Sequence, residues 1–223
     1  MYSSQKIGGV AALIEAVAYV AGFGLYLTLL DSSGYVGPVR KAAFLVDHQA
    51  VIYIANLFIY VIFGVFLVVL ALALCERLKA GAPALVQTAT AFGLIWAGLV
   101  IASGMIFNVG MATVVNLYGK DPAEAALVWL AIGSVQEGLG GGNEIVGGLW
   151  VLLVSWAALR GGALPKALNY LGVAIGVAGI LTVVPALDVL TDVFGLSQIV
   201  WFAWLGIVML RNSQSSQSIT PFR

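Results

Sequence analysis

The sequence predicts an all-α membrane protein, a polytopic bundle of six transmembrane helices. Hydrophobic residues make up 61% of the chain and charged residues only 9%, whereas soluble domains carry about 25% charged residues. The apolar residues also gather into runs close to the roughly 20 residues that a membrane-spanning helix needs. The six candidate spans are residues 7–30, 50–75, 86–110, 139–159, 167–190 and 195–211.

Basic residues predict the orientation of these spans. Loops rich in Lys and Arg stay in the cytoplasm, so the side with more of them is the inner one. One side carries Lys6, Arg77, Lys79, Arg160, Lys166, Arg211 and Arg223, and the other carries Arg40, Lys41 and Lys120. Both termini are therefore expected in the cytoplasm. We expect a single transmembrane helical domain over 1–211 and a polar, disordered cytoplasmic tail over 212–223.

The third and fourth spans run beyond the membrane. Residues 86–118 are helix-compatible throughout and would extend about 50 Å, against an apolar core of about 30 Å. A new helix then starts with Asp121 as N-cap, Pro122 in the first position and Glu124 in the third. We predict an outward-projecting helical extension, or a helix lying at the membrane interface, joined to span four through the glycine break at 140–142. A seventh span here would spoil the charge bias and is not favoured.

A polar segment at 136–144 interrupts this apolar sequence. Carboxylates and broken helix are costly at membrane depth. Glu137 and Glu144 are seven residues apart, as are Gln136 and Asn143, so on an unbroken helix each pair shares one face about 10 Å apart. Two interpretations stay open. Either the glycine break exposes backbone to a polar ligand, or it lies at the outer interface and water solvates the acids.

Glu15 is the most informative single residue, because it sits inside span one among apolar neighbours. A charge facing lipid there would cost about 2.5–3.5 kcal/mol on insertion scales. It must face the bundle, be protonated, or pair with a polar group. The candidate partners are Tyr19, Asn56, Thr88, Thr90, Asn108 and Gln136. A structural hydrogen bond between helices and a proton or ligand role both remain open.

Further polar residues follow span three toward the outside: Ser103, Asn108, Thr113 and Asn116. They either line an outward-opening vestibule or make ordinary interhelical hydrogen bonds, and the second interpretation is favoured. Gly172 and Gly176, four residues apart, predict close helix packing, and Pro185 is expected to kink span five. The basic turns at 71–85 and 157–168 resemble each other, through an internal repeat or through convergence on small residues and Lys.

Several function classes are disfavoured. A net charge of zero gives no basic surface for nucleic acid, so no nucleic-acid partner is expected. A single histidine, His48, argues against multi-histidine metal sites, and the lone Cys75 cannot form an intramolecular disulfide. Nucleotide-loop and hydrolase motifs are missing from the sequence. No catalytic residue, cofactor or metal is predicted, and the chain leans away from being an enzyme.

Three segments, 201–211, 5–15 and 147–150, carry a family resemblance. They resemble the last helix, the opening and an inner stretch of a bacterial family of small six-span integral membrane proteins, classed as a domain of unknown function. The resemblance implies a protein of the bacterial cytoplasmic (inner) membrane. It implies no activity for any residue.

Three hypotheses of function remain. The first is a small transporter-like or ligand-binding protein, with an intramembrane carboxylate and amide cavity between spans one, three and four. The second is a non-catalytic membrane subunit or scaffold that docks a partner through the outer 107–139 hairpin. The third and weakest is an intramembrane enzyme acting on lipid or quinone, because no nucleophile–base or metal set is visible. The candidate ligand- or ion-binding residues are Glu15, Asn108, Gln136, Glu137, Asn143 and Glu144. Besides the lipid bilayer, the expected partners are another protein or a second copy of the chain.

Overall fold

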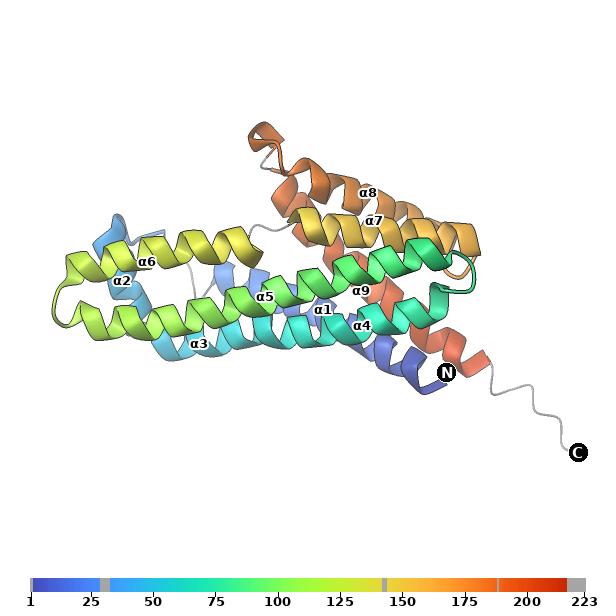
Figure 1. The fold of residues 1–223 in the computed structure, drawn as a ribbon. Helices are drawn as coiled ribbons and strands as arrows, with labels where there is room; N and C mark the ends of the chain where they lie inside the picture. The colour runs from blue at the N-terminus through green and yellow to red at the C-terminus, as the bar shows by residue number, and fades with distance from the viewer. Residues whose placement is uncertain (1, 29–32, 142–143, 188, 216–223) are drawn as a thin grey trace, which may run out of the picture. The chain divides into compact units, whose positions relative to one another are not determined.

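A computed structural model describes residues 2–28, 33–141, 144–187 and 189–215, and within these ranges the chain is helical with no strand (Figure 1). The prediction of an all-α fold is therefore confirmed. In chain order the elements are α1 (Tyr2–Leu27), α2 (Pro38–Asp47), α3 (Gln49–Asn56), the π-helix η1 (Leu57–Ile62), α4 (Phe63–Leu78), α5 (Pro83–Tyr118), α6 (Pro122–Gln136), the π-helix η2 (Glu137–Gly141), α7 (Glu144–Gly161), α8 (Lys166–Leu181), the 3₁₀ turn η3 (Pro185–Leu187) and α9 (Leu190–Ser215).

Five described helical segments are long and apolar enough to cross a membrane. They are Ser4–Leu27, Gln49–Leu78, Pro83–Tyr118, Leu190–Arg211 and Pro122–Gly161, the last with residues 142–143 outside the described part. The remaining apolar helix, α8, has 16 residues, short of the roughly 20 that a span needs. These helices identify an integral membrane protein, and the sixth span stays a prediction.

The expected kink at Pro185 is wrong, and span five is shorter than predicted. Helix α8 ends at Leu181, and Pro185 begins the 3₁₀ turn η3 instead of bending a continuing helix. Proline has no backbone N–H, and its ring clashes with the carbonyl four residues earlier in a helix. That carbonyl belongs to Leu181, so the helix stops where the clash would begin.

The chain divides into two compact units. The first unit comprises residues 1–19, 65–97 and 144–223, and the second comprises 20–64 and 98–143. The single domain expected over 1–211 stays a prediction. The tail expected from 212 starts within α9, which runs to Ser215, and residues 216–223 lie outside the described part.

An aromatic cluster forms the centre of the first unit. Trp150 on α7 is completely buried, with its ring centroid 5.7 Å from that of Trp96, 5.8 Å from Trp201 and 6.3 Å from Phe202. Aromatic side chains contribute large buried areas and favour such tilted and edge-to-face contacts. The members of the aromatic cluster are Tyr19, Trp96, Trp150, Phe194, Trp201 and Phe202.

Glycines let α7 and α8 approach backbone to backbone in the same unit. A Cβ placed on Gly176 would lie 2.7 Å from the carbonyl oxygen of Gly148 and 2.6 Å from Cβ of Leu152. A Cβ on Gly148 would in turn lie 2.8 Å from the carbonyl oxygen of Gly176. No side chain fits at either position. The close packing predicted from Gly172 and Gly176 is confirmed, and α7 and α8 lie side by side in Figure 1.

Arg77, in the last turn of α4, connects three segments of the first unit. Its Nη1 donates to Oε1 of Gln5 on α1 at 2.7 Å, and its Nη2 donates at 2.9 Å to the carbonyl oxygen of Ala163, between α7 and α8. Nε donates to the same carbonyl at 3.3 Å. Nearby, a Cβ on Gly81 would lie 2.6 Å from Cα of Gly161, so the two similar basic turns pack together. Whether they form a repeat stays a prediction.

Replacing Arg77 by methionine is expected to lower the free energy of unfolding by about 2 kcal/mol, because hydrogen bonds from a charged donor contribute about 1.5–3 kcal/mol. The full-length protein in detergent would be unfolded with dodecyl sulfate and followed by circular dichroism. Lys79→Met is the matched control, because Lys79 is an exposed cation of the same turn. It should change the free energy by no more than about 0.5 kcal/mol. Equal effects of the two changes would show that the loss of a positive charge, and not the loss of the Arg77 hydrogen bonds, is responsible.

The second unit contains the α5–α6 hairpin and the extra helix α2. Asp121 caps α6 as predicted, with Oδ1 accepting from the backbone N–H groups of Ala123 at 2.9 Å and Glu124 at 3.0 Å. Helix α2 lies in a stretch between spans one and two that had no predicted helix. It contacts α6 and buries Phe44 and Leu45 in a core with Met111, Val114 and Ala125. The outward projection of this hairpin stays a prediction.

Candidate functional site

Glu15 lies on α1 and has no exposed surface in the first unit. Neither carboxylate oxygen has a hydrogen-bond partner among the described residues, so none of the predicted partners is bound to it. The small side chains Ala11, Ala12 and Ala16 around it are buried as well. Glu15 therefore faces the protein interior and not lipid.

Glycine contacts establish how α1 meets α9. A Cβ on Gly9 would lie 2.8 Å from Cγ of Leu210, and a Cβ on Gly206 would lie 2.8 Å from both the carbonyl oxygen of Gly9 and Cγ of Leu13. Higher residue numbers on α1 thus face lower numbers on α9. The two helices are antiparallel, and their backbones come close at the glycines.

This register places Glu15 beside the aromatic cluster. Further along α1, the ring of Tyr19 stacks on that of Phe202, with centroids 6.1 Å apart. Glu15 lies one turn before Tyr19 on the same face of α1, and it shares that face with Gly8, where a Cβ would meet Ala73 of α4 and Met209 of α9. Gln198 lies one turn before Phe202 on the same helix.

Three more side chains in the first unit have buried polar atoms without a described partner. These atoms are Oγ of Ser155 on α7, both amide atoms of Gln198 on α9, and Nε1 of Trp201 on α9. A Cβ built on Gly172 of α8 would lie 2.6 Å from the indole nitrogen, and the serine hydroxyl is closer still. The hydroxyl and the indole nitrogen are therefore near neighbours across the space that the missing side chain of Gly172 leaves.

Buried polar atoms of this kind call for a physical explanation. In native proteins such atoms are almost always hydrogen-bonded, and each unpaired one costs about 1–3 kcal/mol, an ionised carboxylate far more. Arg77 binds Gln5, ten residues and about 15 Å before Glu15 along α1. It does not neutralise Glu15.

The predicted polar segment is divided between the two units. In the second unit, the carbonyl oxygen of Gln136 accepts a hydrogen bond from Oγ of Ser103 at 2.9 Å, and Glu137 is exposed at the start of η2. Glu144, partly buried, begins α7 in the first unit. Asn143 lies outside the described residues. The chain between Glu137 and Glu144 passes through residues 142–143, which lie outside the described part. The helix face predicted to carry both acids therefore stays a prediction.

Asn108, on α5 in the second unit, takes part in an interhelical hydrogen bond. Nδ2 of Asn56 donates to Oδ1 of Asn108 at 3.0 Å and to the carbonyl oxygen of Gly104 at 2.8 Å. Both asparagines are buried. The favoured interpretation, a hydrogen bond that joins helices, is thus seen for this residue.

A family model described as a domain of unknown function, DUF4386, matches residues 7–210. The chain belongs to this family. No curated protein and no solved structure matches the sequence. The match covers all the described candidate residues, and its description assigns no activity. The family resemblance inferred from the sequence is confirmed, whereas the bacterial origin and the six spans stay predictions.

The DUF4386 chain holds three functional candidates that the sequence did not suggest: Ser155, Gln198 and Trp201. Gln198 could have been found by the reasoning used for Glu15, because it is a polar side chain inside the apolar run 195–211. Trp201 and Ser155 gave no such signal, since both are common in membrane helices. Among the described residues, no group of three or more His, Cys, Asp or Glu side chains is placed to hold a metal ion.

Proposed function

We propose that this DUF4386 protein is a transporter-like or ligand-binding membrane protein that takes up a proton or a small cation at Glu15. One observation carries the proposal: Glu15 is completely buried, and neither of its oxygens has a described hydrogen-bond partner. Ionisable side chains inside membrane helices are rare and mark ion, proton or substrate pathways.

The chemistry of the group favours a positively charged ligand. An ionised carboxylate can only accept hydrogen bonds, so a proton or a cation is what it needs when buried. Gln198, a buried residue of α9 in the same unit, adds an amide that can both donate and accept. Asn108, Gln136, Glu137, Asn143 and Glu144 stay proposed ligand contacts. A cytoplasmic-membrane location with both termini inside belongs to the same proposal and is supported by the charge bias.

The test uses dicyclohexylcarbodiimide, an apolar reagent that modifies carboxyl groups within membranes. We expect the purified full-length protein to be labelled at Glu15, as located by peptide mass spectrometry. Sodium chloride, but not tetramethylammonium chloride at the same concentration, should slow the labelling if the site takes a small cation, and raising the pH should slow it if the site takes a proton. Glu15→Gln should remove the label.

Glu124→Gln is the control, because Glu124 is an exposed carboxylate near the start of α6. It should leave both the labelling at Glu15 and its response to cations and pH unchanged. Labelling at Glu15 that responds to no cation and to no change of pH would contradict the proposal. It would leave Glu15 as a structural group.

The docking role of the 107–139 hairpin is the weaker proposal. Val109 on α5 and Leu127 on α6 are 69% and 67% exposed, as a docking surface requires. A bilayer would cover the same side chains equally well, because lipid-facing helices are apolar on their outer surface. The enzyme alternative has no supporting group among the described residues.

A further inference from the structure

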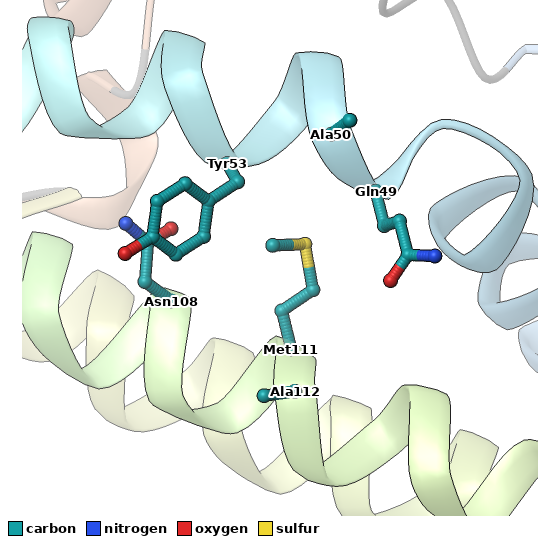
Figure 2. A pocket seen from close by; sticks show the side chains of 6 residues that line it. All are labelled: Gln49, Ala50, Tyr53, Asn108, Met111 and Ala112. Atoms are coloured by element: carbon teal, nitrogen blue, oxygen red, sulfur yellow. The ribbon is translucent and has the colours of Figure 1, made fainter.

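The second unit contains a pocket of about 290 Å³ between α3 and α5 (Figure 2). One side comes from the first turns of α3 and the other from the last third of α5. None of the residues that line it is charged. They are Gln49, Ala50, Tyr53, Asn108, Met111 and Ala112.

Asn108 is the polar group whose orientation is fixed. Its Oδ1 accepts the hydrogen bond from Asn56, which assigns Nδ2 to the other side of the amide. Asn108 is only 8% exposed, and its hydrogen bond with Asn56 uses the amide oxygen and not the amide N–H. The pocket is therefore lined by a nearly buried amide donor held in place by a second asparagine.

The backbone that positions this amide is irregular. Asn56 is the last residue of α3, and the π-helix η1 (Leu57–Ile62) follows at once. A Cβ on Gly104 would lie 2.6 Å from Cβ of Tyr60, so η1 packs directly on α5 at the point where Asn56 donates to that glycine. Short π-helical stretches within α-helices occur frequently at functional sites.

The lining determines the class of ligand. Uncharged walls disfavour ions, and the side chains of Met111, Ala50 and Ala112 suit an apolar ligand. The amide N–H of Asn108 is a donor and suits a ligand with a hydrogen-bond acceptor. Gln49 begins the apolar segment Gln49–Leu78, so this pocket lies near one end of a membrane span. We propose that it binds a neutral amphipathic molecule through a carbonyl oxygen, which Asn108 recognises. A lipid ester and a quinone share this chemistry.

The test measures how a ligand protects a thiol introduced into the pocket. Ala112→Cys is made with Cys75→Ser in the full-length chain, and its reaction with N-ethylmaleimide is timed in detergent. Three probes are added in turn: dioleoylphosphatidylcholine, its ether-linked analogue without ester carbonyls, and decylubiquinone. We expect at least one carbonyl-containing probe to slow the reaction, and the ether lipid to protect about fivefold less well at equal concentration, the effect of one lost hydrogen bond.

Asn108→Asp distinguishes recognition from folding. It keeps an oxygen for the Asn56 donor but removes the amide N–H, so protection should weaken by about fivefold. Asn116→Leu, an exposed asparagine two turns further along α5, should leave protection unchanged. A thiol at exposed Ala131 on α6 should not be protected.

The three probes identify the source of the carbonyl. Protection by the ester lipid but not the ether lipid indicates a membrane lipid, and protection by decylubiquinone alone indicates a quinone-like ligand. Equal protection by the ester and ether lipids, protection by none of the probes, or protection that survives Asn108→Asp would each overturn the proposal. Melting temperatures show that the variants are folded.

Discussion

Replacing Trp150 by alanine is expected to lower the free energy of unfolding by about 3–5 kcal/mol, the usual range for a buried tryptophan. Trp150 has no exposed surface and contacts the rings of Trp96, Trp201 and Phe202. The change would leave a large cavity between the rings that now surround Trp150. Lipid cannot reach it, because Trp150 has no exposed surface.

Trp156→Ala provides the matched control on the same helix. Trp156 is 46% exposed, and the guanidinium carbon of Arg160 lies 5.0 Å from its ring centroid. Its removal should cost about 1 kcal/mol or less, the value of an exposed cation–π contact. Both variants would be measured by dodecyl sulfate unfolding of the full-length protein. Similar losses for the two tryptophans would mean that the aromatic cluster is not the stabilising centre of its unit.

Replacing Gly176 by leucine is expected to cost about 3 kcal/mol, the upper part of the range for overpacking. Its new Cβ would collide with the carbonyl oxygen of Gly148 at 2.7 Å, and backbone cannot rotate away as a side chain can. The two helices must separate or the protein must fail to fold. The unfolding free energy and the yield of monodisperse protein both report this.

Gly133→Leu is the control for that experiment. Gly133 lies on α6, and a Cβ there would meet nothing within 4 Å. Leucine should be neutral or should stabilise by up to about 1 kcal/mol, because it favours helix more than glycine does. If both changes destabilised the protein equally, the general effect of adding a large side chain to a helix, and not the α7–α8 contact, would explain the result.

Local rules of sequence predicted much of this architecture. Asp121 before Pro122 has the side-chain chemistry of a helix start, and α6 begins there. Two glycines four residues apart indicated a close helix contact, because only their lack of a side chain permits it. Glu15 was singled out by the cost of a charge in lipid, and an interior position was one of the three ways to avoid that cost.

Other features depend on tertiary contacts that no local rule contains. Helix α2 is held by its contact with α6, far away in sequence, and its mixed composition gave no span-like signal. Ser155 and Trp201 became candidates only because Gly172 brings α8 against both. Pro185 correctly indicated that a regular helix is interrupted near this position. Whether a proline bends or ends a helix, however, depends on the packing of the residues after it.

The backbone contact between α7 and α8 also limits how the first unit can move. Helices that mesh through long side chains can slide past one another by changes of rotamer, the shear motion of many domains. Gly148 and Gly176 have no rotamers, so α7 and α8 should shift only together, as one rigid hairpin. Ser155 and Gly172 would travel with that hairpin. If a proton or cation that binds at Glu15 causes a rearrangement, Ser155 and Gly172 should stay in contact. The contacts of these two residues with α1 and α9 should be the ones that change.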